Sequence, residues 1–498
     1  MKWVRWISPV LLFVSLSYAQ GWLGQKRIEA LGTYNVSPCI AFEPTTHRPW
    51  IVWTSGLDLV FTRWLGDRWD EPRVIVRGSP DPNLRLMWYP RLTFDSEGRA
   101  WVVWEDLRDD STGGGIYYDV GFSYWQDTFW APDGKVNEPD ADSINDWIAD
   151  ISWGGGEIWC VWHFFPHRGN YPGHLYARRW DRERGEWGPQ MRVTPDYIIK
   201  NYIPSLAVDS TGTPHVVWSV LGSYMLLYSF YKNGEWQEPV LVTDTNYVTG
   251  LVPSLTIDRN GVMHLAFLGG FRNAQRTDIF YCRNDGTGWS EPVLVSQDSG
   301  THQEWICSVA ASCTSNVWVV FVRQYPDPKE EFRVYATHYD GEKWAPEERI
   351  DDSTLQAPEA SEDWITVRSV ALDENDFPWV VSRVYLDSGG NNYSYHIYYN
   401  RYGYPPGVEE ELGREKWSWT IASPSRGALK IQGVVPVTGA VVVEVFDAAG
   451  RQVASREIKS IGLSGQPVTL IDKLSAGVYA CRIKVGGKII VRKFVTVK

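Results

Sequence analysis

A short stretch between two apolar segments holds the densest group of side chains able to exchange protons. Between His163 and His174 the sequence contains three histidines, at 163, 167 and 174, together with Arg168 and Tyr171. Imidazole and phenol groups serve as general bases and acids, and the arginine could neutralise a nearby anion. Histidines are also zinc ligands, but no matching carboxylate or cysteine pattern accompanies them, so we expect no metal site.

Arginines and carboxylates also follow apolar segments in other parts of the chain. Glu105 and Asp109 follow one apolar strand, and three further stretches contain the arginines Arg272, Arg323 and Arg383, the last close to Tyr385. A cluster of arginines could hold an acidic substrate, and a carboxyl group or a tyrosine could act as acid, base or nucleophile. The catalytic candidates are therefore His163, His167, Tyr171, Arg323, Arg383 and Glu105.

Aromatic residues stand just before several apolar strands. They are Trp88, Tyr89, Trp147, Tyr202, Trp305 and Trp364. With Arg272 they form our predicted ligand-binding set, because aromatic faces beside cations suit sugar rings that carry acidic groups. The alternative is that the aromatic rings only fill the centre of the fold and that the charged residues are solvated.

A repeated unit must position these residues. Its clearest copy, Ile203 to Thr243, contains four short apolar segments and the Asn233-Gly234 dipeptide, which favours a two-residue hairpin. Four antiparallel strands in about 50 residues are typical of one blade of a β-propeller. A Trp-x-(x)-Pro marker opens the last strand of each unit, at Trp69, Trp130, Trp187, Trp236, Trp289 and Trp344.

A seventh unit lacks this last strand, and the start of the chain can supply it. Trp22 to Ile28 has the same W-x4-R-I spacing as Trp344 to Ile350. We therefore predict an all-β, seven-bladed propeller whose ring is closed by the N-terminal strand. In such a ring the loops that contain the candidate residues surround one mouth of the central channel.

Turns between the first two strands of several units contain Asp-x-x-Gly, as at Asp95, Asp209 and Asp258. The pattern resembles a calcium signature, but its position predicts a turn in which Asp bonds the backbone and Gly adopts positive φ. Asp285-Gly-Thr-Gly-Trp289 and Asp340-Gly-Glu-Lys-Trp344 resemble degraded Asp-boxes of the sialidase-like repeat propellers. The leading Ser and the N-terminal Arg-Ile-Pro motif of the sialidases are absent, so the resemblance implies the architecture more than the enzymatic activity.

The first 19 residues have the pattern of a secretion signal. Lys2 and Arg5 precede an apolar run that ends at Ser17-Tyr18-Ala19, a small-residue cleavage site. The run is short for a membrane span, and no later stretch is long and apolar enough, so we expect export and no transmembrane segment in the mature chain.

Charge and cysteine content exclude several functions. Residues 421–498 contain 12 basic and 4 acidic side chains, whereas the rest contains 36 and 56. An acidic repeat domain argues against nucleic acid as a partner. The six cysteines show no CxxC pairing, and we expect most to be buried thiols. No P-loop, dinucleotide fingerprint or serine elbow is present, so no cofactor is predicted.

The C-terminal segment follows a linker, which we place at 404–420 after a propeller at 20–403. Its alternating apolar residues predict a small immunoglobulin-like β-sandwich at 421–498. Val443 to Val453, Leu474 to Tyr479 and the terminal Lys-rich strand resemble the type A sorting domain of the type IX secretion system. That resemblance implies export to the cell surface or release, with the secretion machinery as a partner. The usual Pro-Asn-Pro opening is replaced by Ser423-Pro-Ser425.

From the sequence we therefore expect a surface-displayed or secreted propeller that binds a glycan or a protein at the channel mouth without catalysis. The first alternative is a carbohydrate-active enzyme, either a sialidase-like hydrolase or a polysaccharide lyase. The second is a structural surface protein.

Overall fold

Antiparallel sheets of similar size repeat along the chain. The computed structural model describes residues 21–28, 31–79, 85–110, 115–138, 144–166, 173–198, 200–223, 225–243, 248–271, 276–297, 302–325, 331–351, 363–387, 393–403, 420–421, 425–426, 428–432, 441–447, 451–458, 468–472, 477–485 and 488–497. Every regular element in these ranges is a strand, and they contain no helix that could cross a membrane. Trp22–Gly403 forms one compact unit; Tyr404–Lys498, grouped with Met1–Gly21, is described separately.

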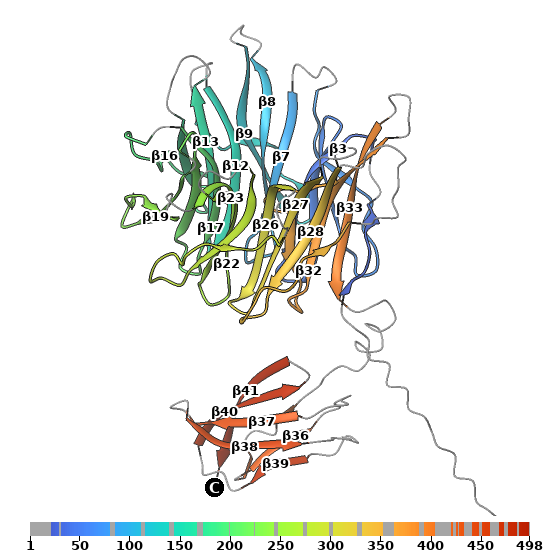
Figure 1. The fold of residues 1–498 in the computed structure, drawn as a ribbon, viewed down its shortest axis with the longest axis vertical. Coiled ribbons are helices and arrows are strands. Elements are labelled where there is room, and N and C mark those ends of the chain that lie inside the picture. Colours follow the sequence, from blue (N-terminus) through green and yellow to red (C-terminus); the bar gives the residue numbers. More distant parts are fainter. Residues whose placement is uncertain are drawn as a thin grey trace, which may run out of the picture. The chain divides into compact units, whose positions relative to one another are not determined.

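The described part of the first unit contains seven sheets, which are the blades of a propeller (Figure 1). Each blade runs from an inner strand at the axis to one or two short outer strands. Blades 1 to 3 comprise β3 (Asn35–Glu43), β4 (Arg48–Ser55), β5 (Asp58–Arg63) and β6 (Arg73–Val76); β7 (Arg85–Phe94), β8 (Ala100–Asp110), β9 (Gly115–Gln126), β10 (Phe129–Trp130) and β11 (Gly134–Lys135); and β12 (Ile144–Gly154), β13 (Glu157–Pro166), β14 (His174–Asp181), β15 (Glu186–Trp187) and β16 (Met191–Arg192).

Blades 4 to 7 repeat this order. They comprise β17 (Asn201–Val208), β18 (Pro214–Val220), β19 (Met225–Lys232), β20 (Glu235–Trp236) and β21 (Val240–Leu241); β22 (Val248–Ile257), β23 (Met263–Phe271), β24 (Asp278–Asn284) and β25 (Val293–Leu294); β26 (Gln303–Cys313), β27 (Asn316–Tyr325), β28 (Glu331–Tyr339) and β29 (Glu348–Arg349); and β30 (Asp363–Trp364), β31 (Val370–Leu372), β32 (Pro378–Asp387) and β33 (Tyr393–Gly403).

The N-terminal strand completes the last blade, as the W-x4-R-I spacing predicts. β1 (Gly21–Trp22) and β2 (Lys26–Arg27) pair with β33, with Arg27 opposite Tyr398. The amide of Ile28 donates to the carbonyl oxygen of Ile397 over 2.8 Å, and the Ile28 side chain is buried. The ring is therefore closed by strands from the two ends of the propeller sequence, which holds its first and last blades together.

A recurring contact of tryptophans joins each blade to the one before it. The marker tryptophan of every blade meets an aromatic ring of the preceding blade edge to face, with ring centroids 5.0 to 6.1 Å apart. This arrangement is favoured by the ring quadrupoles. The seven pairs are Trp69–Tyr399, Trp130–Phe61, Trp187–Phe122, Trp236–Trp159, Trp289–Tyr228, Trp344–Tyr281 and Trp22–Trp318.

Arg368 closes the centre of the ring. Its Nη2 lies 2.6 Å from Asp150 Oδ2 of blade 3 and 2.5 Å from the Leu206 carbonyl oxygen of blade 4, and its Nη1 donates to the Leu255 carbonyl oxygen of blade 5. Side-chain oxygens on the inner strands continue this network, since Ser205 and Ser254 accept backbone N–H groups of the next blade. The channel is thus filled by hydrogen-bonded groups below its mouth.

The Asp-x-x-Gly segments are turns, as predicted. In the turn after β22, Asp258 Oδ1 accepts the amides of Asn260 and Val262, and Gly261 has φ of 82°. The second oxygen of Asp258 meets His264 Nε2 at 3.1 Å, so the carboxylate is fully used within the blade. The cysteines at 39, 160, 282 and 307 are buried free thiols.

The C-terminal unit contains two sheets in its described part. One has the order β34 (Thr420–Ile421), β36 (Ala428–Gln432) and β39 (Val468–Asp472). The other has the order β35 (Ser425–Arg426), β41 (Lys488–Val497), β40 (Gly477–Val485), β37 (Val441–Phe446) and β38 (Gln452–Ile458). β35 joins β41 in parallel, and the remaining pairs are antiparallel.

Candidate functional site

A β-bulge recurs near the start of six inner strands. The register with the second strand shifts between Val36 and Cys39 in blade 1 and at the corresponding place in blades 2 to 6. In five blades the bulge contains a non-glycine residue with positive φ; these are Ser37, Tyr89, Ile148, Ile203 and Val252, with φ between 44° and 56°. Bulges re-aim side chains, and all five residues line the same cavity.

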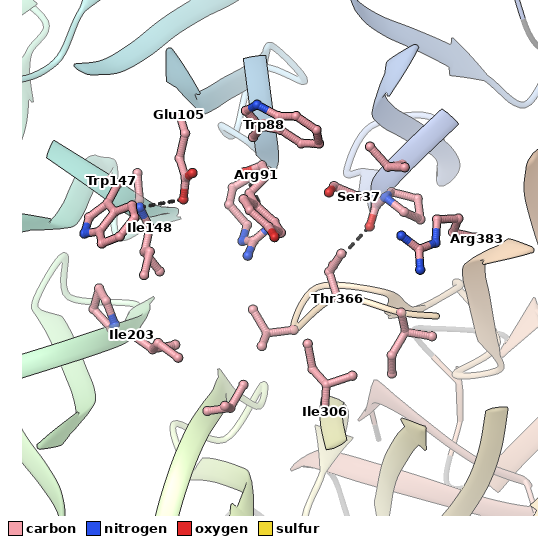
Figure 2. Close-up of a pocket in the computed structure, with 18 of the residues that line it drawn as sticks. Ser37, Trp88, Arg91, Glu105, Trp147, Ile148, Ile203, Ile306, Thr366 and Arg383 are labelled. Carbon is pink, nitrogen blue, oxygen red and sulfur yellow. Dashed lines mark hydrogen bonds between the residues drawn. The ribbon is translucent and has the colours of Figure 1, made fainter. Parts of the chain in front are cut away.

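This cavity occupies the mouth of the channel and has a volume of about 620 Å³ (Figure 2). Its floor includes Ile365, Thr366 and Val367, which lie just before Arg368 in the chain. Its walls come from the inner strands of blades 1 to 6, from β8 and β9 of blade 2, and from β32 of blade 7. The aromatic lining consists of Tyr34, Trp88, Tyr89, Tyr118, Trp147, Tyr202 and Trp305.

Glu105 is the one carboxyl group among the described residues that line the cavity. It belongs to β8, lies opposite Trp88 in the sheet and is only 4% exposed. Its Oε1 accepts the backbone N–H of Ile148 over 2.8 Å, which ties blade 2 to the bulge of blade 3. Burial raises the pKa of Glu105 to about 7, although this hydrogen bond and the charge of Arg91 lower it.

Two guanidinium groups enter the cavity, one from each of the two blades that flank blade 1. Arg91, on β7 of blade 2, donates to the carbonyl oxygen of Pro90 over 3.1 Å and is 7% exposed. Arg383, on β32 of blade 7, stacks over the ring of Tyr395 at 4.9 Å. Both line the cavity, so it can receive an anionic group.

Three cavity tyrosines are held in the protonated form. Burial raises the pKa of Tyr89, Tyr118 and Tyr202, and the nearby charge of Glu105 raises each further. A phenol that keeps its proton remains a hydrogen-bond donor. The cavity therefore offers donors from tyrosine and arginine around one carboxyl group.

His163 lies behind the cavity and supports Trp147. The indole Nε1 of Trp147 donates to His163 Nδ1 over 2.6 Å, and the two rings stack at 6.0 Å. Burial lowers the pKa of His163 to about 3, with the charge of His174 acting in the same direction. A neutral imidazole that accepts at Nδ1 has its proton on Nε2, so His163 acts as a fixed hydrogen-bond acceptor for Trp147.

Arg323 lies away from the cavity. It belongs to β27, is 3% exposed and forms ion pairs with Glu304 at 2.9 Å and with Glu347. Its guanidinium also stacks over Tyr335 at 4.6 Å. The two carboxylates neutralise the charge of Arg323 within blade 6. Arg323 therefore packs inside that blade and does not line the cavity.

The other sequence candidates divide into three groups. The cavity contains Trp88, Tyr89, Glu105, Trp147, Tyr202, Trp305 and Arg383. His167, Arg168, Tyr171 and Arg272 lie outside the described residues, as do the side chains of Asp109 and Trp364, although the backbone of Trp364 pairs with Arg383. Tyr385 packs against Tyr395 with ring centroids 5.2 Å apart.

Sequence reasoning missed Arg91, Tyr118 and the aliphatic residues of the bulges. Arg91 carried a signal, because a charged residue directly after Pro90 inside an apolar strand requires an unusual environment. Within the described residues, no three His, Cys, Asp or Glu side chains are arranged to hold a metal ion.

Comparisons with known proteins identify the C-terminal segment. Residues 423–498 match the family described as the secretion system C-terminal sorting domain. No curated protein matches the chain. Similar solved structures include a family 25 polysaccharide lyase, an ulvan lyase (11% identity, TM-score 0.47, 74% of this chain and 95% of that one). Others are the polysaccharide lyase Uly1 (11%, 0.47, 73% and 89%) and an α-L-arabinofuranosidase from Fusarium graminearum (12%, 0.42, 64% and 93%).

At sequence identities of 11 to 12%, these structures share only the fold with this chain, and one fold supports many unrelated functions. The sorting domain is more specific, and it shows that the chain is exported by the type IX system to the cell surface or the extracellular space.

Proposed function

We propose that the exported propeller binds a glycan in the cavity at its channel mouth, without catalysis. The observation that supports this most directly is the convergence of Trp88, Trp147, Trp305 and two arginines on one cavity of about 620 Å³. Ligand cavities of this kind fall within about 300–1,000 Å³ and combine apolar walls with a few polar groups.

Each part of the lining suits one part of a sugar. Trp and Tyr faces stack on the C–H faces of sugar rings, and their polar edges remain available for hydroxyl groups. Trp305 is fixed for this role because its Nε1 donates to Gln324 Oε1 over 2.7 Å. Arg91 and Arg383 favour a glycan that carries carboxylate or sulfate groups, since guanidinium binds such groups with paired hydrogen bonds.

Binding without hydrolysis is favoured by the number of carboxyl groups. A glycoside hydrolase of the usual kind needs two carboxyl groups about 5 to 10 Å apart. Among the described residues of the cavity, Glu105 is the one carboxyl group, and its Oε1 already holds the Ile148 amide.

The experiment is a glycan array together with a set of acidic polysaccharides, probed with purified residues 21–498. Trp147→Ala and Arg383→Ala are expected to reduce binding about tenfold or more, as stacking and charged contacts are worth about 1–3 kcal/mol. Tyr197→Ala is the control, because this exposed tyrosine lies outside the cavity. Retention of all glycans by Trp147→Ala and Arg383→Ala, or no retention by the unchanged protein, would contradict the proposal.

A second candidate function rests on the pKa of Glu105. A carboxyl group with a pKa near 7 is suited to proton transfer at neutral pH, and neutral tyrosines and arginines surround it. Such a group could remove a proton from an acidic sugar in an elimination reaction. Unsaturated products formed by the unchanged protein and abolished in Glu105→Gln would favour this activity over binding alone.

A further inference from the structure

The cavity has two chemically different sides. Blades 3 to 6 each contribute one half-buried aliphatic residue, namely Ile148, Ile203, Val252 and Ile306. Blades 1, 2 and 7 contribute the polar side chains of Ser37, Arg91, Glu105, Thr366 and Arg383, and their aliphatic lining residues Val36, Ile365 and Val367 are buried. Figure 2 shows Ile203 across the cavity from Ser37 and Arg383.

The bulge geometry does not dictate this division. Ser37 and Tyr89 have the same left-handed backbone as Ile148, Ile203 and Val252, with φ from 44° to 56°. A polar or aromatic residue therefore fits the bulge as well as an aliphatic one does. The choice of aliphatic residues in blades 3 to 5 needs a separate reason.

That choice is also unfavourable for the backbone. Left-handed φ is rare for β-branched residues, and glycine or asparagine would adopt it with less strain. Three β-branched residues in adjacent blades nevertheless occupy it, at Ile148, Ile203 and Val252. Strain of this kind persists where surrounding structure enforces it, and it is concentrated at ligand sites.

An aliphatic wall selects against a fully hydroxylated ligand face. A hydroxyl group pressed against Ile203 and Val252 would lose its water and find no hydrogen-bond partner there. A methyl group at the same place gains from burial, because removal of apolar surface from water is favourable.

We infer that the sugar unit held in the cavity carries an exocyclic methyl group, which packs on the aliphatic wall formed by Ile148, Ile203, Val252 and Ile306. This inference rests on the proposed glycan binding. The methyl group belongs to a 6-deoxy sugar or to an acetyl substituent, while the opposite side of the unit faces Arg91 and Arg383.

Matched ligand pairs test the inference on the unchanged protein. For the 6-deoxy source, oligosaccharides ending in L-fucose or L-rhamnose are compared by calorimetry with those ending in L-galactose or L-mannose. For the acetyl source, an O-acetylated oligosaccharide is compared before and after mild alkaline deacetylation. The methyl-bearing member of at least one pair is expected to bind about 10-fold or more tightly, the usual discrimination of a hydrophobic pocket.

The variants Ile203→Asn and Val252→Asn link the preference to the wall. Asparagine tolerates the left-handed backbone, so folding is preserved while the methyl preference falls to about 1-fold. His47→Asn is the matched control, because His47 also has positive φ, 55°, but lies outside the cavity. Glycan binding with equal affinity in all pairs would overturn the inference alone, whereas no glycan binding would overturn the proposed function as well.

Discussion

Replacing Glu105 with glutamine isolates the energetic effect of one buried carboxyl group. Burial raises its pKa from 4.5 to about 7. Between these values the folded state keeps a proton that the unfolded state has released, so this group makes stability fall as pH rises from about 4.5 to 7. A difference of about 2.5 pKa units corresponds to about 3 kcal/mol, which is fully lost above pH 7.

The Glu105→Gln variant removes this dependence and keeps the contact that the carboxyl group makes. Glutamine has a carbonyl oxygen that can accept the Ile148 amide, now 2.8 Å from Glu105 Oε1. The unfolding entropy of about 380 residues is about 0.8 kcal/mol/K, so about 3 kcal/mol corresponds to about 4 °C.

Thermal unfolding of both proteins, measured by differential scanning fluorimetry from pH 4 to 8.5, gives the result as a difference of Tm. The two proteins should agree near pH 4.5, and the variant should be about 4 °C more stable at pH 8. Taking the difference cancels the titration of all other groups. Parallel curves over the whole range would refute the account, because they would mean that Glu105 does not titrate within it.

Other predictions concern the supports of the cavity and the sorting domain. Arg368→Met leaves a buried carboxylate without its cation and should cost about 3–5 kcal/mol of stability in chemical unfolding. Arg323→Met should also lower stability by an amount of this order, but calorimetry should find glycan affinity unchanged, since Arg323 lies outside the cavity. His163→Ala removes the acceptor of the Trp147 indole and should weaken glycan binding, measured as Kd, about fivefold or more. Deletion of residues 423–498 should keep the propeller from the cell surface, as measured by fractionation and immunoblotting.

The closure of the ring could be predicted because it depends on a local pattern. The spacing from Trp22 to Ile28 repeats that from Trp344 to Ile350, and both segments are outer strands, β1–β2 and β29. An outer strand of this kind can be recognised from its own residues, because its tryptophan and its buried isoleucine stand at a fixed spacing. Its pairing with the last blade could be predicted because the seventh unit of the sequence lacks a fourth strand.

The bulges could not be predicted from apolar patterning, although the sequence marks them. The inner strands β3, β7 and β22 begin three to five residues before Pro38, Pro90 and Pro253. Proline lacks an N–H and is tolerated in a strand at a bulge. The prolines therefore mark the interruption of each ladder rather than its start.

The position of Arg323 depended on a contact across a blade. We expected Arg323 to lie with Arg272 and Arg383 in loops around the channel mouth. β27 instead continues to Tyr325, and Glu347 reaches the guanidinium from the segment just before the outer strand β29. No local pattern shows this pairing, because the ion pair joins residues 24 positions apart in the chain.

Two independent energetic costs meet at the channel mouth. Elsewhere in the ring, buried charges are matched: Arg368 is paired with Asp150, and Arg323 with Glu304. In the cavity, by contrast, the Glu105 carboxyl has a raised pKa, and the bulges place aliphatic residues in the left-handed conformation. Closing a propeller requires neither feature, since a glutamine would hold the Ile148 amide and an asparagine would fit the bulge. Their coincidence in one cavity therefore favours a ligand site over simple filling of the channel.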